Sequence, residues 1–235
     1  MTIERIEHPT PPPGNMDAML DALASQGWYE WPQALSPKLC QQLLQESEAY
    51  ARADKLAPAG IGRGSIHQRN AEIRRDKIRW LDGKSLAQTQ FLQQMAQMKD
   101  TLNQAFFLGL FEYEAHFARY EQGDFYKKHL DSFKGRANRM VTTVVYLNPD
   151  WQADWGGELV IWPRVSDLTD AANEPPDAST IEQPLARILP EMGKMVVFLS
   201  EDFPHEVLPT QHPRVSIAGW FRCNTSLGGI VDPAH

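Results

Sequence analysis

The stretch His129-Leu130-Asp131 decides how the rest of the chain is interpreted. If it is extended, side chains at positions i and i+2 point to the same face, so His129 and Asp131 can hold one ion while Leu130 packs behind them. His205 would complete the set from a distant strand. Two imidazoles and one carboxylate on one face of an octahedral metal leave three positions open, as in non-haem Fe(II) oxygenases.

Arg214 follows His205 by nine residues and begins a run that is typical of a buried strand, Arg214-Val215-Ser216-Ile217-Ala218-Gly219-Trp220. Its planar guanidinium can pair with a carboxylate through two parallel hydrogen bonds. A dicarboxylate such as 2-oxoglutarate would chelate iron through its keto-acid end and present its far carboxylate to Arg214, in the mouth of a barrel. The pattern therefore predicts an oxygenase with a dicarboxylate cosubstrate.

Each of these residues also has an ordinary structural interpretation. In a chain with 7 histidines, a His-x-Asp triplet arises often by chance. His205 fits a turn that precedes a strand, and Arg214 fits a strand end with a surface ion pair. The order of the residues, their spacing and the strand patterns around them favour a joint site.

The second half of the chain shows short extended segments with turn-rich connections. Such segments favour a double-stranded β-helix, so the predicted fold class is mainly β with flanking helices (α+β), a jelly-roll barrel. The stretch 163–190 is rich in Asp, Glu and Pro, which predicts a surface lid or excursion. The predicted strands are residues 112–120, 140–148, 158–162, 194–199 and 215–222.

The first half is expected to hold helices that buttress this barrel. Residues 1–14 form a proline-rich leader, and Asn15 is a candidate cap for a helix that stops at Gly27. Ser36-Pro37 is a typical helix start. A helix over 86–107 carries an apolar stripe that indicates packing rather than a cofactor. Further predictions are a strand at 28–31, a loop at 56–70 and a strand at 78–80.

Length and composition agree with one catalytic domain over residues 15–235, with the helical buttress at about 15–110 and the barrel core at about 111–223. The net charge of -7 disfavours a nucleic-acid partner. Two local basic clusters are either solvated or suited to an acidic protein surface. They are Arg74, Arg75, Lys77 and Arg79, and Lys127, Lys128, Lys134, Arg136 and Arg139.

The two cysteines, Cys40 and Cys223, form no metal-binding pair or redox motif. Together with the absence of a signal-peptide pattern and of a membrane-length apolar run, they predict free thiols in a cytoplasmic protein with no membrane partner. A monomer is the favoured state.

Several further motifs occur in a fixed order along residues 70 to 222. On these motifs the chain resembles the 2-oxoglutarate and Fe(II)-dependent dioxygenases, within them the prolyl 4-hydroxylases, and most nearly the hypoxia-inducible-factor type of prolyl hydroxylase. The motifs are Arg75-Asp76-Lys77-Ile78-Arg79-Trp80-Leu81-Asp82-Gly83, Arg119-Tyr120, Val145-Tyr146-Leu147-Asn148-Pro149-Asp150-Trp151, Gly156-Gly157-Glu158-Leu159 and Pro204-His205-Glu206-Val207.

The resemblance implies a role for each candidate residue. His129, Asp131 and His205 would bind Fe(II), and Arg214 and Tyr146 would bind the distal carboxylate of 2-oxoglutarate. Tyr120 would line the pocket near the metal. The substrate entrance would be shaped by Arg139, Tyr126 and Trp220, each of which could instead be a packed or surface side chain. Arg75 and Asp76 would be substrate contacts.

The resemblance also implies the cosubstrates and the reaction. Fe(II), 2-oxoglutarate and O2 would act together, with ascorbate as a candidate reductant, and succinate and CO2 would be the co-products. The expected substrate is a prolyl residue in a protein or peptide, and elongation factor Tu is the first candidate. Two departures leave substrate choice open: Ser132 stands where animal members usually carry Asn, and the segment after Trp162 is longer here.

Three alternatives remain at this point. The chain could hydroxylate free proline or another small molecule. It could be a binding or oxygen-sensing module that turns over poorly, although such a module has no need for Arg214 and Tyr146. A zinc hydrolase could use the same three ligands, but it would leave Arg214 unexplained.

Overall fold

The computed structural model describes residues 13–60, 71–132, 138–164 and 183–223. The predicted leader up to residue 12, the glycine-rich part of the 56–70 loop and most of the 163–190 excursion lie outside these residues. So do Lys134 and Arg136 of the second basic cluster.

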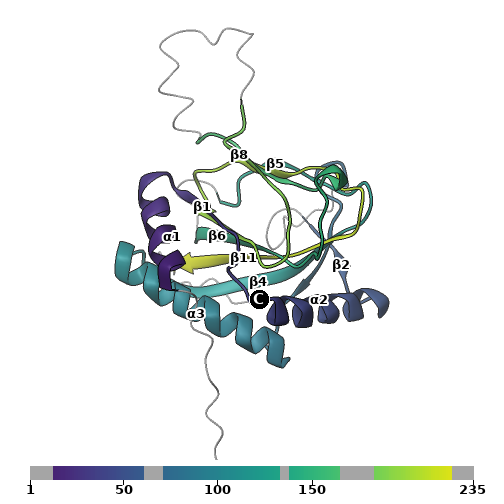
Figure 1. The fold of residues 1–235 in the computed structure, drawn as a ribbon, viewed down its shortest axis with the longest axis horizontal. Coiled ribbons are helices and arrows are strands. Elements are labelled where there is room, and N and C mark those ends of the chain that lie inside the picture. The colour runs from purple at the N-terminus through teal and green to yellow at the C-terminus, as the bar shows by residue number, and fades with distance from the viewer. Residues whose placement is uncertain (1–12, 61–70, 133–137, 165–182, 224–235) are drawn as a thin grey trace, which may run out of the picture.

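The described strands form two antiparallel sheets (Figure 1). The major sheet has the order β1-β9-β6-β11-β4-β3-β2, and the minor sheet has the order β5-β10-β7-β8. This is the double-stranded β-helix that the strand pattern predicts. The strands of the major sheet are β1 Trp28–Trp31, β2 Ala57–Pro58, β3 Lys77–Trp80, β4 Leu110–Tyr120, β6 Arg139–Tyr146, β9 Met195–Leu199 and β11 Arg214–Cys223. Those of the minor sheet are β5 Tyr126–His129, β7 Leu159–Ile161, β8 Ala186–Ile188 and β10 His205–Val207.

Three α-helices, α1 Pro13–Ser25, α2 Pro37–Arg52 and α3 Leu86–Phe106, cover the outer face of the major sheet (Figure 1). As predicted, α2 begins after Ser36, whose side chain accepts a hydrogen bond from the backbone N–H of Leu39. The prediction that Asn15 caps the first helix is wrong, because α1 begins at Pro13. Proline suits the first turn of a helix, where its missing N–H leaves no bond unmade.

Side chains alternate between two apolar layers along each central strand. Val141 and Val145 of β6 face the helices, whereas Val144 and Tyr146 face the minor sheet. The stripe predicted on α3 belongs to the first layer: Phe91, Met95, Met98 and Leu102 are all buried. The second layer joins the two sheets and forms the interior of the barrel.

Several elements differ from their predictions. β8 lies within the predicted excursion, yet Ile188 is 1% exposed and packs inside the barrel. The excursion therefore ends before Ala186. No bounds were predicted for β8 or for β10, the strand that supplies His205. Each has three residues with a charged one at its centre, so both lack the apolar run that indicated the equally short β7. β2 likewise occupies two residues of the predicted 56–70 loop.

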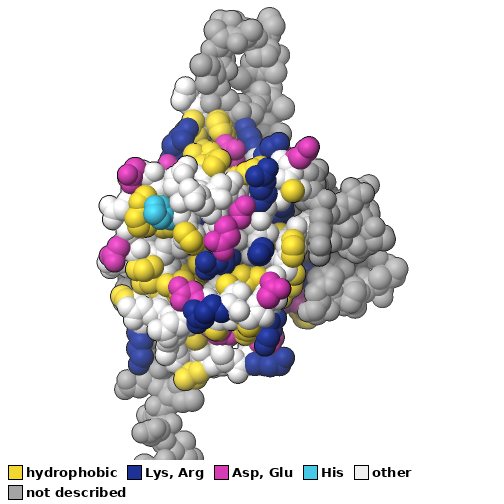
Figure 2. Space-filling model, turned by 90° about the vertical axis from the view of Figure 1, so that its right-hand side faces the viewer, with side chains coloured by type: hydrophobic (Ala, Val, Ile, Leu, Met, Phe, Trp, Pro, Cys, Tyr) yellow, Lys and Arg dark blue, Asp and Glu magenta, His cyan; other side chains and the backbone are white. Residues whose placement is uncertain are grey.

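No α-helix in the described residues is long and apolar enough to cross a membrane. On the face drawn in Figure 2, lysine and arginine side chains lie among aspartate and glutamate side chains. The described part of this face carries no continuous basic surface.

Candidate active site

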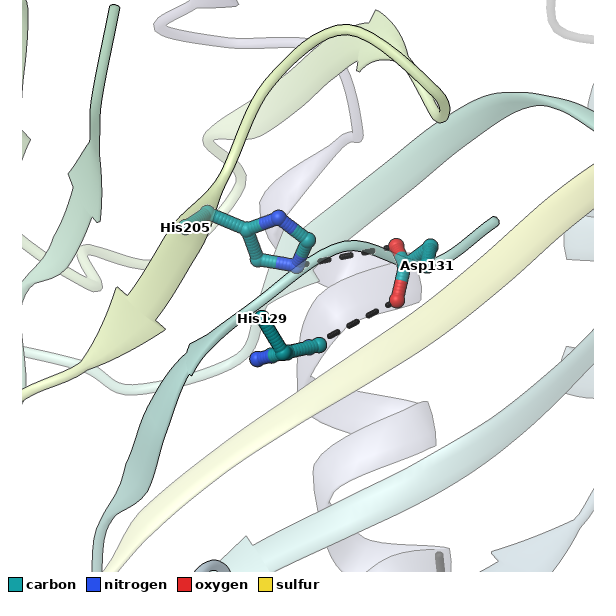
Figure 3. Close-up of side chains that lie close together, drawn as sticks. All are labelled: His129, Asp131 and His205. Atoms are coloured by element: carbon teal, nitrogen blue, oxygen red, sulfur yellow. Dashed lines mark ion pairs between the residues drawn. The ribbon is translucent and has the colours of Figure 1, made fainter. Parts of the chain in front are cut away.

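His129, Asp131 and His205 converge on one point (Figure 3). His129 is the last residue of β5, and His205 is the first residue of β10, where the two are cross-strand partners. Asp131 lies two residues after the end of β5, so it reaches the site from a bend and not from the extended strand that its spacing predicted. Nε2 of His129 is 3.6 Å from Oδ1 of Asp131, and Nε2 of His205 is 3.6 Å from Oδ2.

Backbone carbonyls fix the orientation of both imidazoles. Nδ1 of His129 is 2.8 Å from the carbonyl oxygen of Lys127, and Nδ1 of His205 is 3.0 Å from that of Phe203. Because a carbonyl only accepts, each Nδ1 carries the proton and each Nε2 presents its lone pair to the site. A hydrogen bond from Nδ1 to a backbone carbonyl is typical of histidines that bind metals through Nε2.

The protonation states also suit a cation. Burial, and then the charge of the neighbouring His129, lower the pKa of His205 to about 4, so this imidazole is neutral. Burial by itself would raise the pKa of Asp131, but the neighbouring His205, His129 and Arg139 together lower it, and the carboxylate is ionised. The hydroxyl of Thr142 donates to Oδ2 of Asp131 at 2.8 Å. The donor set of two imidazoles and a carboxylate fits Fe(II).

A stack of planar groups supports His129. The ring of Tyr126 lies 3.5 Å from that of His129, centroid to centroid, at an interplanar angle of 15°. The guanidinium of Arg74 in turn lies over the ring of Tyr126, 4.3 Å from its centroid. Arg74 donates two hydrogen bonds, of 2.7 and 2.6 Å, to the two carboxylate oxygens of the buried Asp76. Arg74 was not among the predicted site residues, although its position two residues before Asp76 is visible in the sequence.

Of the predicted substrate contacts, Asp76 is buried and Arg75 is exposed. Asp76 is held in the pair with Arg74, whereas the exposed Arg75 lies over the ring of Phe125 at 4.9 Å. Their proposed contact with a substrate remains a prediction.

A second polar group lies deeper in the barrel. Arg214 is 1% exposed; its Nε donates to the carbonyl of Gly157 at 2.8 Å and its Nη1 to the hydroxyl of Ser216 at 3.2 Å. Its Nη2 and the hydroxyl of Tyr146 are buried without a partner among the described residues. The guanidinium carbon is 5.1 Å from the ring centroid of Tyr146 and 4.9 Å from that of Tyr120.

These two orphaned donors fit a carboxylate. Buried donors without an acceptor are costly, so native structures rarely retain them unless a ligand completes them. Burial raises the pKa of Tyr146, which keeps its hydroxyl protonated and able to donate. The guanidinium geometry predicted two parallel bonds from Arg214, and the resemblance implied a further bond from Tyr146. In the structure, Nη2 of Arg214 and the hydroxyl of Tyr146 are the donors of this group that have no partner among the described residues.

The predicted entrance residues Arg139 and Trp220 lie together near the three predicted metal ligands. The guanidinium of Arg139 lies 3.6 Å from the ring centroid of Trp220, and its Nε and Nη2 both contact Oε1 of Glu114, at 2.8 and 2.7 Å. Trp220 is opposite Thr142 in the sheet, the residue that donates to Asp131. The structure thus brings the two predicted residues together, and it adds Glu114.

A buried histidine, His116, packs against Trp220. His116 packs edge-on against Trp80 at 5.0 Å and contacts Trp220 at 5.4 Å, measured between ring centroids. Burial, and then the charge of Arg74, lower its pKa from the ordinary 6.5 to about 4. Below pH 6.5 the unfolded chain therefore binds a proton that the folded chain rejects. His116 should make folding less favourable as the pH falls from about 6.5 to about 4.

We expect His116→Phe to remove part of this acid sensitivity. Between pH 7.5 and pH 5.0 the free energy of unfolding of the wild type should fall by about 2 kcal/mol more than that of the variant. Urea unfolding at the two pH values measures the difference, and replacement of the exposed His212 by alanine is the control. Equal losses in wild type and variant would show that His116 is not responsible.

Comparisons with known proteins agree with this geometry. The family model described as the 2OG-Fe(II) oxygenase superfamily matches residues 115–222. A solved prolyl-4-hydroxylase of Pseudomonas putida is 36% identical, with a TM-score of 0.71, and the match covers 88% of this chain and 98% of that one. Fold and site together define a non-haem iron oxygenase. The chain belongs to the 2OG-Fe(II) oxygenase superfamily, and it is similar to prolyl hydroxylases of that superfamily.

Two further relatives extend the likeness. Human Egl nine homolog 1 is 30% identical in an alignment of 158 positions, which covers 64% of this chain and 33% of that protein. This chain therefore spans about a third of the length of that relative. A prolyl hydroxylase of Trichoplax adhaerens, solved with a hypoxia inducible factor peptide fragment, shares the fold, with a TM-score of 0.70 at 23% identity over 89% of each chain.

Proposed function

We propose that this chain hydroxylates a prolyl residue in a protein substrate and releases succinate and CO2. The observation that carries the proposal is the likeness to the Pseudomonas putida prolyl-4-hydroxylase over nearly the whole of both chains. Elongation factor Tu is the first substrate to test, and ascorbate remains a predicted reductant.

Each polar group of the site has a part in this reaction. Nε2 of His129, Nε2 of His205 and the carboxylate of Asp131 would hold Fe(II) from one side. Nη2 of Arg214 and the hydroxyl of Tyr146 would bind the distal carboxylate of 2-oxoglutarate and balance its charge. Fe(II) with 2-oxoglutarate and O2 supplies the oxidising power for hydroxylation of an unactivated C–H bond, and one oxygen atom enters succinate and the other the new hydroxyl.

Apolar walls keep water from this chemistry. Phe198 packs edge-on against His205, with ring centroids 4.7 Å apart, and it is fully buried. Tyr120 closes the wall beside Arg214. In such an enclosed place the charged ligands attract a cation and a carboxylate more strongly than they would in water.

The entrance supports a peptide substrate. Trp80 is 41% exposed and lies 6.3 Å from Trp220, centroid to centroid. Flat rings of this kind can pack against a prolyl ring, and the guanidinium of Arg139 can donate to a peptide carbonyl. Free proline would fill less of this surface, which is why a protein substrate is favoured over a free amino acid.

The test is anaerobic reconstitution with Fe(II), followed by addition of 2-oxoglutarate, O2 and one candidate substrate. Elongation factor Tu, proline-containing peptides and free L-proline are compared, and succinate release and a one-oxygen mass gain are followed. A gain localised to proline in a protein, and lost in His129→Ala and Arg214→Ala, is the expected result. A gain on free proline alone would overturn the protein substrate, and succinate without any oxidised candidate would reject these substrates.

A further inference from the structure

We propose that the turn at Gly156-Gly157 is a positioning device for the cosubstrate carboxylate, because it sets which nitrogen of Arg214 remains available. This inference rests on the proposed role of Arg214. The paired glycines belong to a motif that is visible in the sequence, Gly156-Gly157-Glu158-Leu159, but the metal and the cosubstrate donors do not include them.

The contact between Gly157 and Arg214 is direct. The carbonyl of Gly157 accepts the hydrogen bond from Nε of Arg214 at 2.8 Å, and the hydroxyl of Ser216 accepts from Nη1 at 3.2 Å. Two of the three guanidinium nitrogens are thereby engaged within the protein. Nη2 has no partner among the described residues, so the contacts at Gly157 and Ser216 together fix the plane of the guanidinium and leave one edge for a ligand.

Gly157 also needs to lack a side chain. Its φ of +71° favours glycine, and a Cβ there would lie 3.1 Å from Cδ of Arg214 and 3.1 Å from Oγ1 of Thr210. Thr210 is fully buried, so it has little room to move. An added methyl group would therefore displace the side chain of Arg214, whose own carbon atom is in the way.

The turn is tied to the segment that leads into Arg214. The backbone N–H of Gly157 donates to the carbonyl of Pro209 at 3.2 Å, and Gly156 forms an isolated β-bridge with Thr210. A Cβ on Gly156 would collide with that same carbonyl of Pro209. Trp151 adds a bond from its Nε1 to the carbonyl of Gly156 at 3.2 Å. The turn and the start of β11 therefore form one packed unit.

Gly157→Ala should weaken the binding of 2-oxoglutarate and leave the metal site intact. The probe is the Mn(II)-loaded protein titrated with 2-oxoglutarate by calorimetry, which reports binding without turnover. We expect the Kd for 2-oxoglutarate to rise by up to about tenfold, because the atoms around the added Cβ must move by a few tenths of an ångström, less than the 1 Å misplacement that can cost about 100-fold. The Kd for Mn(II), measured in the same protein, should stay within about twofold, because the atoms nearest to the added Cβ belong to Arg214 and Thr210 and not to the three predicted metal ligands.

Gly109→Ala is the matched control. Gly109 has a φ of +65°, and a Cβ added to it would meet no atom within 4 Å, so this variant carries the same backbone strain without the contact. Its Kd for 2-oxoglutarate should equal that of the wild type. A Gly157→Ala protein that binds 2-oxoglutarate like Gly109→Ala would overturn the inference.

A measurement on the wild type keeps the inference open to refutation if Gly157→Ala fails to fold. The Nε–H of Arg214, assigned in side-chain NMR spectra by its loss in Arg214→Lys, should exchange slowly with solvent because Gly157 accepts its proton. Rapid exchange in the folded protein would contradict the inference. Arg214→Ala separates the two proposals: if it weakens 2-oxoglutarate binding and Gly157→Ala does not, only the positioning role fails, and if neither does, the cosubstrate site itself is wrong.

Discussion

Asp131→Ala is expected to lose at least about 100-fold in affinity for Fe(II), because changes in residues that merely orient a ligand already cost 10- to 100-fold. Asp131 supplies the only carboxylate of the cluster, and both histidines face it at 3.6 Å. Without this carboxylate, the charge of the cation would be left unbalanced inside the barrel. Anaerobic titration with Fe(II), or with Mn(II), measures the loss, and hydroxylation should disappear with it.

Thr142 offers a graded comparison for this prediction. Thr142→Val removes the hydrogen bond to Oδ2 of Asp131 but keeps the carboxylate, so its metal affinity should fall between those of the wild type and Asp131→Ala. Thr142→Ser retains the hydroxyl and should bind metal as the wild type does. Wild-type affinity in Asp131→Ala, with the fold intact by circular dichroism, would show that the cluster is not the metal site.

Arg214→Ala is expected to raise the Kd for 2-oxoglutarate by roughly two to three orders of magnitude, which corresponds to about 3–4 kcal/mol. The loss is large because the ligand carboxylate would enter a buried place without its cation, and because the carbonyl of Gly157 and the hydroxyl of Ser216 would also lose a donor. Titration of the Mn(II)-loaded protein measures the change. The affinity for Mn(II) should be nearly unaffected, since Arg214 is not a metal ligand.

Arg214→Lys sharpens the prediction. A lysine keeps the charge, but its single nitrogen cannot contact Gly157, Ser216 and a carboxylate in the same fixed plane. We therefore expect little recovery over the alanine variant. Full recovery with lysine would mean that charge alone holds the cosubstrate, and an unchanged Kd in both variants would remove Arg214 from the site.

The sequence predicted the elements whose patterns are local. The stripe on α3 and the start of α2 at Ser36-Pro37 depend on spacing and capping within one element, and both are confirmed. The long strands of the major sheet were found for the same reason. No bounds were predicted for the minor-sheet strands β8 and β10, because each has a charged residue at its centre and lacks the apolar run of the equally short β7.

In the site, too, some residues were predicted from the sequence and others were not. The convergence of His129, Asp131 and His205 was predicted because the donor types and their order restrict the chemistry. The partners that orient them were missed. Thr142 approaches Asp131 through strand pairing, and Arg74 supports His129 through the ring of Tyr126; both relations depend on tertiary structure that no local pattern carries.

The cross-strand pairing of His129 with His205 has a consequence for how the barrel opens. A cation held by both residues would cross-link β5 to β10, although the two strands lie far apart in the chain. β5 and β10 have four and three residues, so few backbone hydrogen bonds oppose their local opening. Because the cation binds only when these strands are in place, its loading should slow amide hydrogen exchange in the minor sheet. The ion would therefore govern the kinetic stability of the wall that encloses it.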